Sequence, residues 1–268
     1  MLDQRGDRRA DQAAVQRLVL VGASNLTKGI GAVLDTALAI WGGPLEVLAA
    51  FGHGRSYGRS TRVLTRELPG IGPCGLWADL SGPARVPTSA LVTDIGNDLL
   101  YEEPVERIAG WVEECFDRLA AAGASTVVTL LPLGNLPGIS AARFTFFRTL
   151  FVPRSRIGLE QVVRRAGELD ACVERLAVER GFATIRPRTE WYGLDPIHIR
   201  FGRRRRAWRE ILSLWTPGDP LPAASRGALV RTLYLRTRTP QRRRLLGFEQ
   251  RGTNPAARLS DGTWVALY

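Results

Sequence analysis

The sequence is poor in the side chains that build disulfide frameworks and transition-metal sites. Its 268 residues include three cysteines, Cys74, Cys115 and Cys172, and two histidines, His53 and His198. Three scattered cysteines exclude a disulfide framework and a zinc site of paired cysteines, and two histidines are too few for most transition-metal sites. We therefore expect no transition-metal site.

Long apolar runs are also lacking. The run Leu18-Val19-Leu20-Val21 is far too short for a signal sequence or a membrane span, so we expect a cytoplasmic protein without a membrane span. Residues 1–16 are expected to form a flexible arm. Apolar residues make up 45% of the chain, which is enough for a packed core.

Lysine occurs once, at Lys28, and the positive charge resides on arginine. The formal net charge is +11, a value that suggests a partner such as nucleic acid. However, residues 199–268 hold 15 arginines and 4 acidic residues, so residues 1–198 balance to zero. The charge therefore describes the C-terminal part, and a charge run is most often a solvated surface.

Short apolar runs alternate with longer stretches of helical period from residue 17 onwards, which predicts an α/β fold with a mainly parallel sheet. The predicted strands are 18–22, 45–51, 91–95, 126–132 and 182–186. Helical spacing predicts helices that end before Gly123 and before Gly181, and a further helix around Trp208. The segment 133–157 has no clear period; it is either a lid-like insertion or, as we favour, a loop with a short helix.

The period changes to two beyond the breaker run 216–220. Leu229–Leu235 and Arg243–Phe248 are predicted strands, and residues 257–260 and 263–268 are predicted to form a hairpin that turns at Asp261-Gly262. We therefore divide the chain into an N-terminal arm (1–16), an α/β domain (17–215) and a basic, β-rich C-terminal extension (216–268).

Four short polar motifs follow predicted strands, at the sheet edge where α/β proteins build their sites. Gly22-Ala23-Ser24-Asn25 places a serine at a helix start, and Gly52-His53-Gly54-Arg55 offers a backbone N–H donor. A serine at a helix start can be a nucleophile, although alone it is more often a helix N-cap. A glycine-rich turn is likewise usually only a turn.

The other two motifs carry an amide and a carboxylate–imidazole pair. Asn97 can donate to an oxyanion, or can close an Asx turn or cap a helix. Asp195 and His198 lie three residues apart, so the carboxylate can fix the imidazole tautomer while the other ring nitrogen faces a serine.

The ordered set Ser, Gly, Asn and Asp-x-x-His resembles the SGNH (GDSL-type) hydrolase family over about residues 17–215. The resemblance implies a three-layer α/β/α, flavodoxin-like fold with a mainly parallel five-stranded sheet, here with a small C-terminal β appendage. The chain departs from the family pattern at Ala23, where the family has aspartate, and at Ile95-Gly96 before the asparagine. The extension 216–268 is additional to the family core.

The resemblance also implies roles for individual residues. Ser24 would be the nucleophile, His198 the general base and Asp195 its orienting acid. The N–H groups of Ser24 and Gly54 and the side chain of Asn97 would form the oxyanion hole. Gly54 is chosen over Gly52 because Gly54-Arg55-Ser56 is similar to a motif of carbohydrate acetylesterases in this family. The candidate substrate contacts are Asn25, His53 and Arg55.

The implied activity is hydrolysis of a carboxylic ester through an acyl-enzyme, a mechanism that needs no metal and no cofactor. The sequence leaves the acyl group, the alcohol (small-molecule, carbohydrate or lipid) and the oligomeric state open, and a thioester or transfer to another acceptor fits the same motifs. Two alternatives from other classes remain: a catalytically silent protein with this fold, and an anion- or nucleic-acid-binding protein that uses Arg203–Arg206 and Arg242–Arg244.

Overall fold

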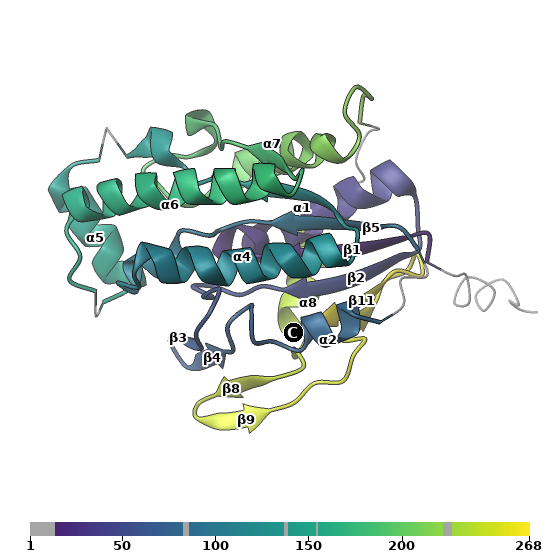
Figure 1. Ribbon diagram of the computed structural model, residues 1–268. Helices are drawn as coiled ribbons and strands as arrows, with labels where there is room; N and C mark the ends of the chain where they lie inside the picture. Colours follow the sequence, from purple (N-terminus) through teal and green to yellow (C-terminus); the bar gives the residue numbers. More distant parts are fainter. Residues whose placement is uncertain (1–13, 83–85, 137–138, 154, 222–226) are drawn as a thin grey trace, which may run out of the picture.

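A mainly parallel, seven-stranded sheet separates two layers of helices (Figure 1). The computed structural model describes residues 14–82, 86–136, 139–153, 155–221 and 227–268. The strand order is β10-β11-β2-β1-β5-β6-β7, and every pair is parallel except β10 with β11. The strands are β1 (Gln16–Val21), β2 (Leu45–Ala50), β5 (Thr88–Val92), β6 (Ser125–Thr129), β7 (Ala183–Ile185), β10 (Ala257–Arg258) and β11 (Trp264–Leu267).

The central strand β1 shows why the fold has three layers. Leu18 and Leu20 point to one face of the sheet and Val19 and Val21 to the other, and all four are fully buried. A strand that is buried on both faces is apolar throughout, which explains the uninterrupted run in the sequence. One face is covered by α1 (Ser24–Trp41), α7 (Arg204–Leu212) and α8 (Ala228–Thr237), and the other by α4 (Val105–Ala121) and α6 (Leu159–Glu179).

The α/β/α architecture is confirmed, as are the helices before Gly123 and Gly181 and the helix around Trp208. The five predicted strands correspond to β1, β2, β5, β6 and β7, but β5 (Thr88–Val92) lies earlier in the chain than the predicted 91–95. The segment 133–157 contains a 3-10 helix, η1 (Leu133–Asn135), and α5 (Ala141–Phe151). The remaining short helices are α2 (Leu76–Leu80), α3 (Asn97–Leu100), η2 (Thr189–Trp191), η3 (Phe201–Arg203) and η4 (Ser213–Trp215). No helix among the described residues is long and apolar enough to cross a membrane.

The prediction of a strand at Leu229–Leu235 is wrong, because this segment is part of helix α8. Its buried side chains, Thr232 and Leu235, are three residues apart, which places them on one side of a helix. Thr232 Oγ1 accepts a hydrogen bond from the Gly31 N–H of α1 at 3.0 Å. The contact with α1 therefore decides the conformation of a run whose own composition fits a strand.

The expectation of a five-stranded sheet with a small C-terminal β appendage also needs correction. The predicted hairpin at 257–268 forms, but β11 pairs with β2 and thereby extends the main sheet to seven strands. Arg55 is fully buried, and its Nη1 donates to the main-chain oxygen of Tyr268 at 2.5 Å. Because β2 would otherwise be an open edge, β11 covers a surface that favours aggregation.

A second, antiparallel sheet lies at the lower side of the molecule in Figure 1. The predicted strand Arg243–Phe248 is in fact two strands joined by a turn at Leu246-Gly247. The four strands of this second sheet run in the order β3 (Thr61–Val63), β4 (Arg66–Leu68), β8 (Arg243–Leu245) and β9 (Phe248–Gln250). The extension thus contributes to both sheets. Of the expected N-terminal arm, residues 1–13 lie outside the described residues.

Candidate active site

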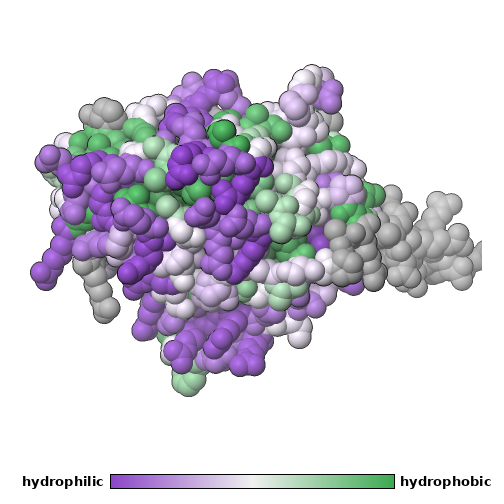
Figure 2. Space-filling model, viewed as in Figure 1, coloured by the Kyte–Doolittle hydropathy of each residue, from purple (hydrophilic) through white to green (hydrophobic). Residues whose placement is uncertain are grey.

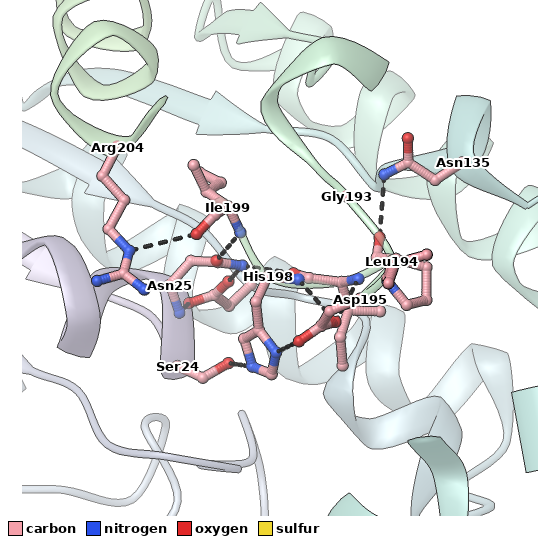
Figure 3. A network of polar contacts seen from close by, with 12 residues as sticks. Ser24, Asn25, Asn135, Gly193, Leu194, Asp195, His198, Ile199 and Arg204 are labelled. Atoms are coloured by element: carbon pink, nitrogen blue, oxygen red, sulfur yellow. Dashed lines mark hydrogen bonds and ion pairs between the residues drawn. The ribbon is translucent and has the colours of Figure 1, made fainter. Parts of the chain in front are cut away.

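Ser24 lies at the carboxyl end of β1, where the chain turns into α1. Its hydroxyl oxygen Oγ is 2.9 Å from Nε2 of His198, which arrives on the segment before α7 (Figure 3). Both residues are largely buried, with 7% and 9% of their surface exposed. The structure therefore joins two residues that are 174 positions apart in the sequence.

Asp195 completes this chain of hydrogen bonds. His198 Nδ1 lies 2.5 Å from Asp195 Oδ2, and the N–H groups of Ile197 and His198 donate to Asp195 Oδ1 at 3.1 and 3.2 Å. Burial opposes ionisation of Asp195, but the hydrogen bond and charge of His198 and the two amides outweigh it and lower the pKa of Asp195. An ionised carboxylate that accepts from Nδ1–H leaves Nε2 as the acceptor for the Ser24 hydroxyl.

Asp94, which the sequence motifs do not single out, organises the turn around Ser24. Its carboxylate accepts the N–H groups of Ala23, Asn25 and Leu26 at 2.9, 3.0 and 3.2 Å. Asp94 thereby supplies a carboxylate to a turn in which the family aspartate is replaced by Ala23. The Ser24 N–H does not donate to Asp94, and within the described part of the chain it has no acceptor.

Asn25 connects the Ser24 turn to the His198 segment, as Figure 3 shows. Its Nδ2 donates to the Ile197 carbonyl and its Oδ1 accepts the Ile199 N–H, each at 2.8 Å. The same Nδ2 also donates to Asp94 Oδ1 at 2.8 Å. Asn25 lines the cavity beside Ser24, but its amide is engaged by the protein, so its position supports a positioning role more than the expected substrate contact.

Three further side chains hold the segment that carries Asp195 and His198. Asn135 Nδ2 donates to the Pro196 carbonyl at 2.9 Å, and Arg204 Nε donates to the Ile199 carbonyl at 3.2 Å (Figure 3). Arg143 of α5 donates to the Leu194 carbonyl, through Nε at 2.7 Å, and to the Gly193 carbonyl at 2.9 Å. A segment without regular structure is thus fixed from three sides.

Asn97 and Gly54 lie on neighbouring turns. Asn97 Nδ2 is 3.5 Å from the Arg55 carbonyl, and Asn97 lines the same cavity as Ser24. Gly54 has a φ of +61°, which disfavours other residues, and its N–H has no acceptor among the described residues. Its carbonyl accepts the Tyr101 hydroxyl at 2.5 Å. The structure brings both candidate donors to the Ser24 end of the sheet.

Neither of the other two candidate substrate contacts, Arg55 and His53, lines the cavity. Arg55 does not line the cavity: its guanidinium is fully buried and donates to the Pro69, Phe51 and Tyr268 main-chain oxygens. The expectation of a substrate contact at Arg55 is therefore wrong. His53 is partly buried, and burial together with the nearby charges of Arg236 and Lys28 lowers its pKa to about 4. His53 is accordingly neutral at neutral pH.

An apolar cavity extends from Ser24 toward α5 and α6. Its volume is about 130 Å³. Beyond the polar residues near Ser24 the cavity is lined mainly by apolar side chains, among them Leu131, Leu136, Ile139, Phe144, Phe147, Val162 and Ala166. Part of the segment 133–157 thus lies against the site. The described residues contain no group of three or more His, Cys, Asp or Glu side chains placed to hold a metal ion.

The sequence itself has no close match: no protein-family model fits it, and no curated protein sequence matches it. Solved structures do resemble the fold. An aryl esterase of M. smegmatis is 14% identical with a TM-score of 0.51, and the match covers 75% of this chain and 99% of that one. The carbohydrate acetylesterase Est24 of Sinorhizobium meliloti is 15% identical, with a TM-score of 0.51 and coverages of 75% and 98%.

A second carbohydrate acetylesterase family member from Sinorhizobium meliloti is 18% identical with a TM-score of 0.50, and the match covers 75% of this chain and 97% of that one. At such low identity these matches establish the architecture alone. The architecture agrees with the order and placement of the four motifs. The chain has the SGNH hydrolase fold.

Proposed function

We propose that the protein is a serine hydrolase that cleaves carboxylic esters through an acyl-enzyme. The observation that carries this proposal is the continuous chain of hydrogen bonds from Ser24 Oγ to His198 Nε2 at 2.9 Å and from His198 Nδ1 to Asp195 Oδ2 at 2.5 Å. A catalytically silent protein has no need of a buried nucleophile, base and carboxylate in this order.

In the first step Ser24 Oγ attacks the ester carbonyl carbon and His198 Nε2 takes the hydroxyl proton. Asp195 stays ionised, keeps the imidazole in the productive tautomer and stabilises the imidazolium. The tetrahedral intermediate then collapses, the C–O bond to the alcohol breaks, and His198 returns the proton to the leaving oxygen. Ser24 is left acylated.

Water cleaves the acyl-enzyme in the second step, with His198 again acting as the base. In both steps the negative oxygen needs donors, and we assign this role to the Ser24 N–H, the Gly54 N–H and Asn97 Nδ2. The two backbone groups have no acceptor among the described residues, so they are available to a ligand. This availability supports their assignment to an oxyanion hole.

The cavity supports an acyl group larger than acetyl. Its volume of about 130 Å³ is close to that of engineered apolar cavities, about 150 Å³, that bind benzene. Apolar walls favour an apolar guest, because burying each methylene contributes about 0.8 kcal/mol. We infer that the preferred acyl group is an aryl group or an alkyl chain of medium length.

The test is hydrolysis of p-nitrophenyl esters from acetate to octanoate. Wild type is expected to hydrolyse them and Ser24→Ala to be inactive, while Asn97→Ala lowers kcat about 10²- to 10³-fold by removing one oxyanion donor. A serine-directed phosphonate should label wild type at Ser24. If wild type turns over no ester faster than Ser24→Ala and the phosphonate does not label Ser24, the proposal fails.

A further inference from the structure

Two adjacent hairpin turns of the small sheet expose large apolar side chains. Leu64, in the turn between β3 and β4, is 90% exposed, and Leu246 and Phe248, at the turn between β8 and β9, are 65% and 76% exposed. The Leu246 N–H donates to the Thr65 carbonyl at 2.8 Å, which ties the two turns together. We call Leu64, Leu246 and Phe248 the apolar tip.

Both leucines occupy backbone conformations that leucine disfavours. Leu64 has a φ of +54° and Leu246 a φ of +53°. The left-handed region suits glycine and asparagine, and the turn at Leu246-Gly247, with both φ values positive, is one in which asparagine followed by glycine is preferred. In water, therefore, each leucine is unfavourable both for the backbone and for the exposed side chain.

The exposed charges on the small sheet around the apolar tip are mainly basic. On strands β3, β4, β8 and β9 and their immediate flanks, the exposed arginines are Arg62, Arg242, Arg244 and Arg251, whereas Arg66 and Arg243 are half-buried. Glu249 is exposed and forms ion pairs with Arg242 at 3.3 Å and with Arg251 at 3.0 Å, which leaves an excess of positive charge. Figure 2 shows hydrophilic side chains over this lower part of the molecule, with a small apolar patch at its edge. Apolar side chains at the end of a cationic surface match the interface of an anionic bilayer.

We propose that the apolar tip and its surrounding arginines dock the protein onto an anionic lipid surface. In this arrangement Leu64, Leu246 and Phe248 enter the boundary between headgroups and acyl chains, and the arginines contact lipid phosphates. A nucleic acid would use the arginines but would leave the exposed leucines in water. The proposal does not depend on the enzymatic activity.

Docking would bring the membrane close to the Gly54 turn. A β-carbon added to Gly54 would lie 2.8 Å from Val63 Cγ2, so the β3–β4 hairpin packs directly against this turn. Val63 precedes Leu64, which places the apolar tip one residue from that contact.

The experiment is co-sedimentation of the full chain with vesicles of phosphatidylglycerol and phosphatidylcholine, compared with vesicles of phosphatidylcholine alone. The test variant is Leu64→Asn with Leu246→Asn, because asparagine tolerates the left-handed backbone and should keep the melting temperature at or above that of wild type. The control is Val178→Asn, which removes a 66% exposed apolar side chain from α6.

Wild type and the control should bind the anionic vesicles, and the double variant should bind them at least about tenfold more weakly, since burial of two leucines is lost. Binding should also weaken as salt screens the arginines. The proposal is overturned if wild type binds neither vesicle, or if the double variant binds as wild type does. It is equally overturned if the tip instead mediates a dimer, seen as a concentration-dependent mass that the double variant abolishes without lipid.

Discussion

At the scale of single residues, the geometry around Ser24 depends on two neighbouring side chains, Asp94 and Asn25. Asp94 gathers the amides of Ala23, Asn25 and Leu26, and Asn25 bridges to the backbone on both sides of His198. Since the Asn25 amide donates and accepts at once, no other neutral side chain of its size can replace both bonds. Asn25 thus fixes the position of His198 relative to Ser24.

We expect Asn25→Ala to lower kcat about 10- to 100-fold with little change in KM, because a displacement of about 1 Å of the base costs about this factor. The variant should retain phosphonate labelling of Ser24, at a reduced rate. The matched control is Asn135→Ala, which removes a single bond, to the Pro196 carbonyl, and should reduce kcat less. Equal kcat values for Asn25→Ala and wild type would contradict a positioning role.

The sequence was sufficient to predict that Ser24, Asp195 and His198 lie close together, because each follows a strand and the carboxyl ends of parallel strands meet at one edge. It was not sufficient to predict the contacts of Asp94, since an aspartate at a strand end carries no pattern that distinguishes it from a turn residue. It was misleading for Arg55, whose neighbourhood in a glycine-rich motif suggests access to substrate. The structure shows that Arg55 is fully buried and donates to the main-chain oxygens of Pro69 and Tyr268.

At the scale of elements, the helices α5 and α6 decide what the cavity can hold. Val162 and Ala166 lie one turn apart on α6 and both line the cavity, while Phe144 and Phe147 approach it from α5. The α5 side chains come from a segment whose sequence has no clear period, and the period of α6 indicates only which of its side chains are buried. The sequence therefore does not predict the shape of the cavity that these side chains line.

Val162→Phe should shorten the acyl group that the protein accepts. Val162 is 8% exposed, so the larger ring can only fill the cavity or strain the core. We expect kcat/KM for p-nitrophenyl octanoate to fall about 10- to 100-fold, the equivalent of losing one buried apolar group, while kcat/KM for the acetate changes less than about threefold.

The control for this prediction is Val178→Phe, the same substitution at an exposed position of α6. It should leave the chain-length profile as in wild type. The prediction is contradicted if Val162→Phe, with a melting temperature near that of wild type, reduces both esters equally. If wild type hydrolyses neither ester, the esterase proposal itself fails, and this result is distinct from a failure of the chain-length prediction.

Contacts between elements also explain why the strand predicted at Leu229–Leu235 is in fact part of helix α8. A run such as Leu229–Leu235 has leucine and valine at both helical and alternating spacings, so its own sequence does not decide between the two structures. The decision comes from α1, where Gly31 permits close approach: a β-carbon there would lie 1.9 Å from the Ala228 carbonyl oxygen. Contacts between residues about 200 positions apart thus override the local pattern.

At the scale of the whole molecule, the basic extension is joined to the rest of the chain by strand pairing. Val265 of β11 lies opposite Val47 of β2 and is fully buried. Charge separates residues 199–268 from the rest of the chain, but charge acts at the surface and carries no information about the core. The breaker run and the change of period to two suggested a β appendage, whereas the pairing of β11 with β2 makes one continuous sheet.

Because β11 is part of the main sheet, we expect that a charged side chain at a buried position of β11 destabilises the whole core. Val265→Asp buries an unpaired carboxylate, which costs about 3–5 kcal/mol; this is a large part of the 5–15 kcal/mol that typically stabilises a domain. At about 2–4 °C per kcal/mol for a chain of this size, the melting temperature should fall by about 10 °C, and ester hydrolysis should be lost in the same thermal transition.

Val230→Asp, the same change at a 72% exposed position of α8, should shift the melting temperature by less than about 2 °C. A Val265→Asp protein that keeps the wild-type melting temperature and activity would show that residues 216–268 are a separate appendage after all.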